Sequence, residues 1–208
     1  MGEEHDMTGG VLDEALRLLD ELLHTQGVEL DLVVVGGGAM LLAGLIERPT
    51  ADLDALARVE SERLQDPAPF APELQKAIAT VGAALGLVTG DGATRAWLNA
   101  GPSALLELAM LPPGFQTRLQ TRRYGSALTI RVASRIDLIY LKMLAATDIR
   151  RGARRAVDIQ DLHELKTTRD EAIAAGRWVA RVDGRRDCFE IDVLPVLKAL
   201  GVEATDDR

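Results

Sequence analysis

The hydrophobic residues near the start of the chain recur at the spacing of a helix. Between Val11 and His24 they fall three and four positions apart, and Gly27 follows as a stop signal. The apolar and β-branched run from Leu32 to Val35 predicts a buried strand. After three glycines, the apolar run from Ala39 to Ile46 predicts a short helix. The first part of the chain therefore has the order helix, strand, glycine turn, helix.

The middle of the chain carries strand patterns around a further helix. Leu53 to Val59 is the second predicted strand, and the proline-rich segment Asp66 to Pro72 ends it. A helix is predicted next, over Glu73 to Leu85. Further along, Leu119 to Arg123 and Ala127 to Val132 flank a Tyr-Gly-Ser turn, which predicts a β-hairpin.

Helical patterns dominate the last third of the chain. Ser134, with Asp137 three residues later, resembles a capping box at the start of a helix that runs to about Ile149. Further helices are predicted over Ala153 to Leu165 and near Asp192 to Leu200. Between Gly86 and Gly114 the pattern fits short strands or helical turns equally well, for example at Trp97–Asn99 and Leu105–Leu111.

Strands therefore concentrate before residue 133 and helices after it. This order predicts an α+β fold with a small mixed β-sheet flanked by helices. We expect a core over residues 1–132, of which residues 1–9 are disordered, and a helical part over residues 133–208 that completes the active-site cleft.

Two aspartates and three glycines make the segment between the first two strands the main candidate for chemistry. Asp52 and Asp54 are two residues apart on a predicted extended segment, so both side chains point to the same side and can bind one divalent metal. Mg²⁺ prefers such oxygen ligands, and two ions could bind when a triphosphate is present. Gly36, Gly37 and Gly38 would allow the backbone to approach phosphate groups closely. The segment predicts a site for a metal-bound nucleoside triphosphate.

The composition excludes several other classes. The longest apolar run, Leu32 to Ile46, is too short to cross a bilayer, and the acidic start lacks the features of a signal peptide. We therefore expect a cytoplasmic protein with no membrane partner. Cys188 is the only cysteine, which excludes an internal disulfide and a multi-cysteine zinc site. Its neighbours Arg185 and Arg186 suggest an exposed thiol with a lowered pKa.

The net charge of −8 is distributed unevenly along the chain. Residues 115–157 contain ten Arg or Lys against two acids, so this segment carries +8 and the remainder −16. A basic segment in an acidic protein can bind a polyanion where it faces outward, or it can form a solvated surface with local ion pairs. The candidate RNA-binding residues are Arg118, Arg122, Arg123, Arg150, Arg151, Arg154 and Arg155.

The glycine turn, the short helix and the sequence Arg48-Pro49-Thr50-Ala51-Asp52-Leu53-Asp54 resemble the first motif of the DNA polymerase beta-like nucleotidyltransferase superfamily. The later residues Leu138 to Ala145 (LIYLKMLA) and the segment Arg154 to Leu162 are similar to the abortive-infection-type nucleotidyltransferase toxins of bacterial toxin–antitoxin systems. The resemblance covers roughly residues 30 to 166.

The resemblance implies roles for individual residues. The Gly36-Gly37 turn would hold the nucleotide phosphates, and Asp52 and Asp54 would coordinate Mg²⁺. Lys142 matches the lysine that contacts the triphosphate, and Asp158 matches the acidic residue that completes the site or activates the acceptor hydroxyl. The group is known for adding nucleotides to transfer RNA acceptor ends and for inhibition by a cognate antitoxin.

Several points remain open at the level of sequence. Arg48 either orients the segment around the two aspartates or contacts the phosphates, and Thr50 shapes the turn through its side chain. A third carboxylate is expected near Leu128 to Val132, but the sequence has Arg131 there, so Asp158 serves instead or the enzyme is weak or inactive. The alternatives to transfer RNA are a protein or small-molecule hydroxyl, or a non-catalytic module that binds a nucleotide or a partner.

Overall fold

The computed structural model describes residues 6–87 and 96–204. These residues have the α+β fold with a mixed sheet that the sequence pattern predicted, and they contain six strands in one sheet and eight α-helices. Their contacts divide them into two compact units. Unit 1 contains the residues up to Leu111 together with Gln116–Ala133, and unit 2 contains Pro112–Phe115 and the chain from Ser134 onward.

The mixed sheet forms the centre of unit 1. Its strands follow the order β3-β2-β1-β6-β5, and β4 pairs with the start of β2. Strands β1 and β6 are parallel, as are β2 and β4, whereas β1–β2, β2–β3 and β5–β6 are antiparallel. The strands are β1 (Leu30–Val35), β2 (Leu53–Glu60), β3 (Arg63–Gln65), β4 (Leu98–Asn99), β5 (Gln120–Arg123) and β6 (Leu128–Val132).

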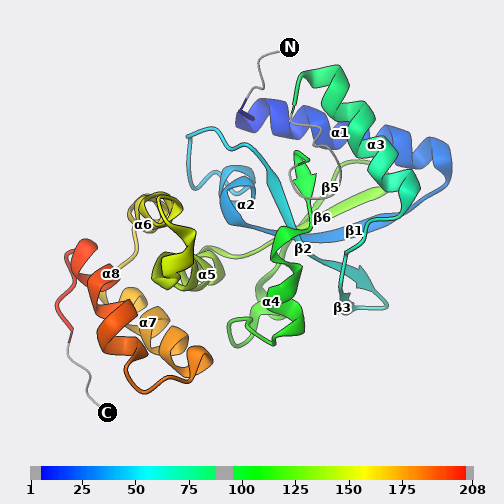
Figure 1. The fold of residues 1–208 in the computed structure, drawn as a ribbon. Helices are drawn as coiled ribbons and strands as arrows, with labels where there is room; N and C mark the ends of the chain where they lie inside the picture. Colours follow the sequence, from blue (N-terminus) through cyan, green and yellow to red (C-terminus); the bar gives the residue numbers. More distant parts are fainter. Residues whose placement is uncertain (1–5, 88–95, 205–208) are drawn as a thin grey trace. The chain divides into compact units, whose positions relative to one another are not determined.

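Four α-helices accompany the sheet. They are α1 (Gly9–Gln26), α2 (Gly36–Leu42), α3 (Pro72–Leu85) and α4 (Ala104–Glu107). Thr8 caps α1 by accepting a hydrogen bond from the backbone of Val11, and Gly27 ends the helix in a left-handed conformation. Helices α1 and α3 lie side by side in unit 1 (Figure 1). Their buried leucines, valines and alanines form much of the core of this unit.

The beginning of the chain is more ordered than the sequence suggested. Residues 1–5 lie outside the described residues, but Met7 is fully buried. The N–H group of Met7 donates to the carbonyl of Thr50 at 2.6 Å, and the Thr50 N–H donates back to Met7 at 3.0 Å. The expectation of disorder is therefore wrong for residues 6–9. The buried Met7 side chain and this pair of backbone hydrogen bonds connect the segment to the loop that precedes β2.

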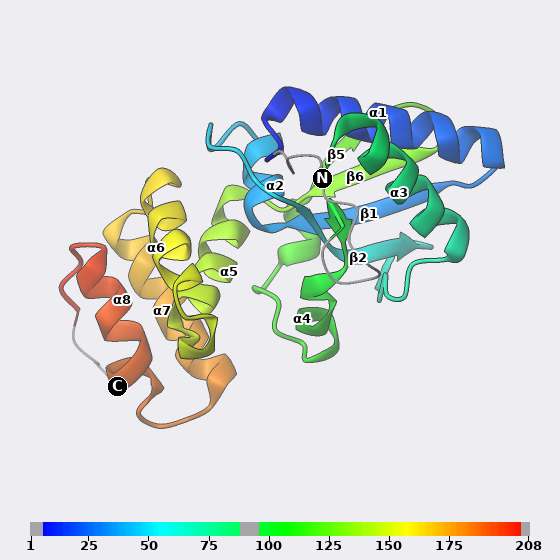
Figure 2. The same cartoon turned by 45° about the horizontal axis from the view of Figure 1, so that its top comes forward.

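Unit 2 is helical (Figure 2). It consists mainly of α5 (Arg135–Thr147), α6 (Arg154–Glu164), α7 (Arg169–Asp183) and α8 (Leu194–Ala199), with a π-helical turn, η4 (Phe189–Val193), before α8. Ser134 caps α5 by accepting from the N–H of Asp137, as its sequence indicated. Tyr140 on α5 and Trp178 on α7 pack with their ring centroids 5.5 Å apart.

Two elements were not predicted from the sequence, the short strand β3 and helix α7. In addition, the ambiguous segment around Trp97 forms strand β4, and part of the Leu105–Leu111 segment forms the single turn of α4. Among the described residues, no helix is long and apolar enough to cross a bilayer.

Candidate nucleotide and metal site

The glycine turn in unit 1 connects β1 directly to α2. The helix begins at Gly36, not at Ala39 as the sequence predicted, so the three glycines form its first turn. The residue before them, Val35, has no side-chain oxygen to cap the helix. Gly36 has a φ of +74°, a conformation that favours glycine. The first turn of α2 therefore presents backbone rather than side chains beside the end of β1.

Asp54 lies against this turn. It pairs in register with Val35, the last residue of β1, and its carboxylate approaches Gly36. A Cβ atom at residue 36 would lie 2.5 Å from Oδ2 of Asp54. Asp52 immediately precedes β2, two residues before Asp54, and both aspartates are partly buried. The structure thus places the Asp54 carboxylate beside the glycine turn and the half-buried residue Asp52 just before β2.

The third glycine has a clear packing role. A Cβ atom at Gly38 would lie 2.8 Å from the carbonyl oxygen of Asp52 and 3.0 Å from the Cα atom of Leu53. These are backbone atoms that cannot rotate away. Gly38 therefore permits α2 to pack closely on the chain that carries the two aspartates.

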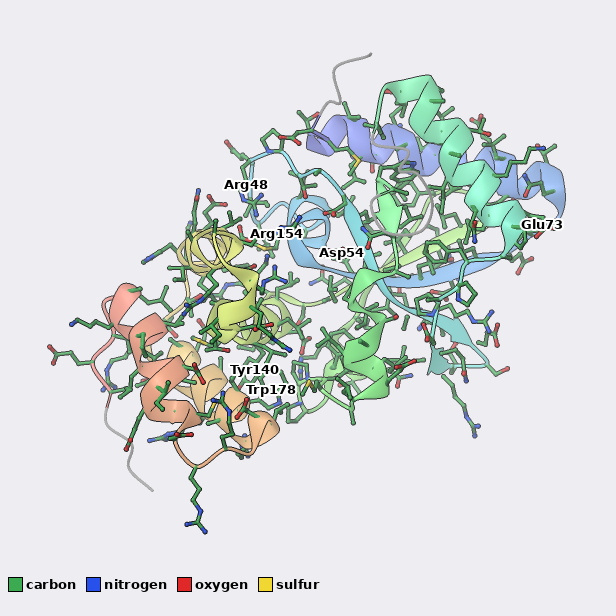
Figure 3. The ribbon with its side chains drawn as sticks, viewed as in Figure 1. Arg48, Asp54, Glu73, Tyr140, Arg154 and Trp178 are labelled. Carbon is green, nitrogen blue, oxygen red and sulfur yellow. The ribbon has the colours of Figure 1, made fainter. Side chains whose placement is uncertain are left out.

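Arg48 and Thr50 lie in the loop between α2 and β2, and Figure 3 shows Arg48 in this loop and Asp54 on β2. A Cβ atom at Gly37 would be 3.1 Å from Oγ1 of Thr50 and 3.5 Å from Nη2 of Arg48. The Thr50 hydroxyl donates to the carbonyl of Asp52 at 3.2 Å, so Thr50 shapes the turn as its sequence context indicated. The loop therefore brings the Arg48 guanidinium close to Gly37, where it could contact an anion bound at the turn.

Asn99 is a further polar residue beside Asp54, and the sequence pattern did not predict a role for it. Asp54 and Asn99 are register partners on the parallel strands β2 and β4. The third carboxylate was expected on the strand near Leu128–Val132, but that strand is β6, which pairs with β1. Arg131 on β6 forms an ion pair with Asp31 at 2.8 Å. Within residues 6–87 and 96–204, no three or more His, Cys, Asp or Glu side chains are grouped in a way that could hold a metal.

Lys142 and Asp158 lie in unit 2, where they belong to a buried charge cluster. Nζ of Lys142 is 2.9 Å from Oδ1 of Asp158 and 2.6 Å from Oδ2 of Asp161. Nε of Arg151 donates to Oδ2 of Asp158 at 2.9 Å. Both aspartate side chains are at most 2% exposed, and that of Lys142 is 12% exposed. Two cations thus balance two anions, which is what burial of carboxylates requires. The second cationic partner of Asp158, besides Lys142, is Arg151.

The candidate RNA-binding arginines are divided between the two units. In unit 1, Arg122 and Arg123 are exposed and line a shallow depression of about 480 Å³ together with Arg17. In unit 2, Arg150 forms an ion pair with Asp148 at 2.8 Å, and Nε of Arg155 donates to the carbonyl of Ala146 at 2.8 Å. Arg150 and Arg155 therefore already take part in local ion pairs or hydrogen bonds.

The thiol of Cys188 is not in the exposed environment that its arginine neighbours suggested. Cys188 is buried, with 1% of its surface exposed. Burial raises its pKa to about 11, and the charge of Asp183 acts in the same direction. The expectation of a lowered pKa is therefore wrong. Arg185 contacts Asp183 and Asp192 instead, so its charge is largely compensated.

Comparison with known families identifies the group to which this arrangement belongs. Residues 12–175 match the model of a family described as nucleotidyltransferase of unknown function (DUF6036). The chain belongs to this nucleotidyltransferase family. The match includes the glycine turn, the Asp52–Asp54 pair and the Lys142–Asp158–Asp161 cluster. No curated protein and no solved structure gave a significant match.

Membership of a nucleotidyltransferase family gives the polar groups in unit 1 a chemical context. The enzyme class transfers a nucleoside monophosphate, and such transfer depends on positioning and on neutralising phosphate charge. The described site has the groups for both tasks. Carboxylates such as those of Asp52 and Asp54 are the type of ligand that Mg²⁺ takes, and glycine backbone N–H groups and a guanidinium such as that of Arg48 are the types of group that bind phosphate.

Proposed function

We propose that the protein transfers a nucleoside monophosphate from a nucleoside triphosphate to an acceptor hydroxyl and releases pyrophosphate, with Mg²⁺ bound by Asp52 and Asp54. The observation that carries this proposal is the close approach of the Asp54 carboxylate to Gly36, 2.5 Å from the place of a Cβ atom. This contact puts a candidate metal ligand next to a glycine turn whose backbone N–H groups could bind phosphates. Membership of a nucleotidyltransferase family supports the same function.

The residues present fit a magnesium ion in chemical type. Mg²⁺ in nucleotide enzymes usually takes one or two carboxylates and completes its shell with phosphate oxygens and waters, and Asp52 and Asp54 supply that share. When bound, the metal would neutralise phosphate charge and help to orient the triphosphate. Around it, Gly36 and Gly37 would present N–H groups to the phosphates, and the Arg48 guanidinium would compensate further negative charge.

The resemblance of their sequence motifs to those of toxin-type nucleotidyltransferases supports a role in the reaction for Lys142 and Asp158. Lys142 would direct positive charge toward the triphosphate, and Asp158 would hold the lysine in position or accept the proton of the acceptor hydroxyl. The contacts that support this role are the ion pairs of Asp158 with Lys142 and Arg151, both 2.9 Å long. These ion pairs fix the position of the ammonium group and also compensate its charge, so binding of a phosphate would have to compete with the two carboxylates.

The acceptor that we favour is the 3′ end of transfer RNA, with the protein acting as a toxin that a cognate antitoxin restrains. The support is the similarity of the later motifs to toxin-type nucleotidyltransferases and the exposed arginines of both units. Arg122 and Arg123 on β5, and Arg154 at the start of α6, are exposed and could contact phosphates of an RNA backbone. A protein or a small-molecule hydroxyl is the alternative acceptor.

The proposal is tested by incubating the purified protein with Mg²⁺ and each α-labelled nucleoside triphosphate, together with total RNA, purified transfer RNA or protein. The variant is Asp52→Ala/Asp54→Ala. Label in transfer RNA that requires both aspartates is the expected result. Label in protein alone would contradict the RNA acceptor while supporting the transfer reaction. If folded protein labels no acceptor in RNA or protein, the RNA-directed activity is refuted.

A further inference from the structure

Asn99 is buried beside Asp54, although no motif in the sequence singles it out. It is 6% exposed and lies on β4, whose two residues pair in parallel with the first two residues of β2. Side chains of register partners on neighbouring strands point to the same face of a sheet. The Asn99 amide therefore stands on the face of the sheet that carries the Asp54 carboxylate.

The turn after Asn99 orients its amide group. The carbonyl Oδ1 of Asn99 accepts a hydrogen bond from the backbone N–H of Gly101 at 2.8 Å. A Cβ atom at residue 101 would lie 3.0 Å from that same oxygen and 4.0 Å from Oδ1 of Asp54. This turn therefore brings residue 101 against both side chains. Because Oδ1 binds Gly101, the amide nitrogen of Asn99, with its two N–H donors, remains for another acceptor.

A neutral amide at this position has a different chemistry from a third carboxylate. A carboxylate would add a third negative charge and accept only, whereas the asparagine nitrogen donates only. An acceptor placed near two metal-binding carboxylates in this enzyme class is an oxygen of the nucleotide, either on a phosphate or on the ribose.

We infer that Asn99 is a nucleotide-binding residue whose side-chain nitrogen donates a hydrogen bond to an oxygen of the nucleoside triphosphate held at Asp52 and Asp54. This inference rests on the proposed function and adds a residue to the same site. The hydrogen bond would fix the nucleotide relative to β2 without adding charge.

The chain contains one asparagine, which makes the test direct. Protein labelled with ¹⁵N only at the asparagine side-chain nitrogen gives a single pair of amide proton signals. We would titrate it with Mg²⁺ and the non-hydrolysable α,β-methylene analogue of each nucleoside triphosphate, and measure binding of the same analogues by calorimetry. The expected result is a shift of both Asn99 side-chain signals that saturates with the calorimetric binding curve.

Two variants separate nucleotide binding from a role in holding the turn. Asn99→Asp keeps the oxygen that accepts from Gly101 but loses both N–H donors, whereas Asn99→Ala loses both functions. We expect each variant to weaken analogue binding by about tenfold or more, as for a lost hydrogen bond to a charged group. Because Asn99→Asp also adds a negative charge beside Asp54, a loss of affinity in this variant supports the inference only together with the shift of the wild-type Asn99 signals.

The outcomes distinguish this inference from the proposed function. If an analogue binds by calorimetry while the Asn99 signals stay in place, the inference is refuted and the proposed function stands. Wild-type affinity in folded Asn99→Asp would refute it in the same way. If no analogue binds to the folded wild-type protein, both the proposed function and the role of Asn99 are overturned.

Discussion

Gly36 and Asp54 lie close enough that a methyl group at residue 36 would collide with the carboxylate. The Cβ position of residue 36 is 2.5 Å from Oδ2 of Asp54, and the backbone of Gly36 has a φ of +74°. The register of β1 and β2 causes this approach, because Val35 pairs with Asp54. The glycine turn therefore sets the position of a candidate catalytic carboxylate.

Replacement of Gly36 by alanine is expected to affect activity more than stability. The new methyl group would displace the Asp54 carboxylate, and misplacement of a reacting group by about 1 Å can lower a rate roughly 100-fold. Gly44→Ala is the matched control, since its φ is +67° and no atom lies within 4 Å of its Cβ position. Both variants should lose about 1–2 kcal/mol of stability from backbone strain.

Nucleotide transfer and urea unfolding of the two alanine variants check this prediction. Equal activity in Gly36→Ala and Gly44→Ala would show that the contact between Gly36 and Asp54 has no functional consequence.

The buried cluster in unit 2 predicts a large stability change at Lys142. Lys142→Met removes the ion pairs to Asp158 and Asp161, which are at most 2% exposed, and should lower the free energy of unfolding by about 3–5 kcal/mol. Adding Asp161→Leu removes one of the two affected carboxylates, so the double variant should recover part of the loss. Chemical denaturation of the three proteins gives the values. A double variant less stable than Lys142→Met would contradict the explanation that unpaired buried carboxylates destabilise the single variant.

Because Lys142→Met is expected to be destabilised, its activity must be measured at a temperature at which the variant is fully folded. Loss of activity in a partly unfolded protein would say nothing about a contact with the triphosphate. Lys142→Met should bind the nucleotide more weakly when it is fully folded, whereas unchanged binding would assign the lysine to structure alone.

Glu171 at the start of α7 predicts a dependence of stability on acid pH. Its hydrogen bonds with Arg135 lower its pKa from 4.5 to about 2, and the backbone of Thr168 acts in the same direction. A lowered pKa stabilises the folded protein above pH 4.5, and this contribution is lost as the pH falls toward 2. Because the side chain is 24% exposed, we expect only about 1–2 kcal/mol.

The comparison for this prediction is Glu171→Gln, which keeps the size and the hydrogen-bonding oxygen but removes the charge. Urea unfolding of both proteins at pH 7, 5, 4 and 3 should show a stability difference that is constant above pH 5 and shrinks toward pH 3. A difference that does not change with pH would argue against an ionised Glu171–Arg135 pair.

Cys188 should react slowly with thiol reagents in the folded protein. Its pKa of about 11 and its burial reduce both the thiolate fraction and the access of reagent at pH 8. We expect a reaction roughly 100-fold slower than in denaturant, measured with a chromogenic disulfide reagent. Similar rates in the folded and the denatured protein would mean that the thiol is exposed.

Local patterns in the sequence predicted most of the elements, and the exceptions have physical reasons. Strand β1 and helix α5 were found because apolar periodicity and the Ser134 cap act over a few residues. Helix α7 was missed because its buried face consists largely of small residues such as Ala172, Ala175 and Gly176. Its capping box, Thr168 with Glu171, was a local signal that could have identified its start.

The candidate site was predictable only in part for a different reason. Asp52, Asp54 and the glycines lie within one short segment, so spacing alone brought them together in the prediction. The position of Asn99 depends on the pairing of β4 with β2, which joins residues 45 positions apart and leaves no periodic pattern in a two-residue strand. The place of Arg131 likewise follows from the pairing of β6 with β1.

The proposed role of Asp54 in transfer of a nucleoside monophosphate can be tested by comparing the fates of the α and γ phosphates. We would incubate the protein, Mg²⁺ and transfer RNA with α-labelled or γ-labelled nucleoside triphosphate, using wild type, Asp54→Asn and the control Glu60→Gln. Glu60 lies at the far end of β2 and is 57% exposed. We expect α label but no γ label in RNA for wild type and Glu60→Gln, and neither label for Asp54→Asn. Transfer of α label by folded Asp54→Asn at the wild-type rate would contradict the proposed role.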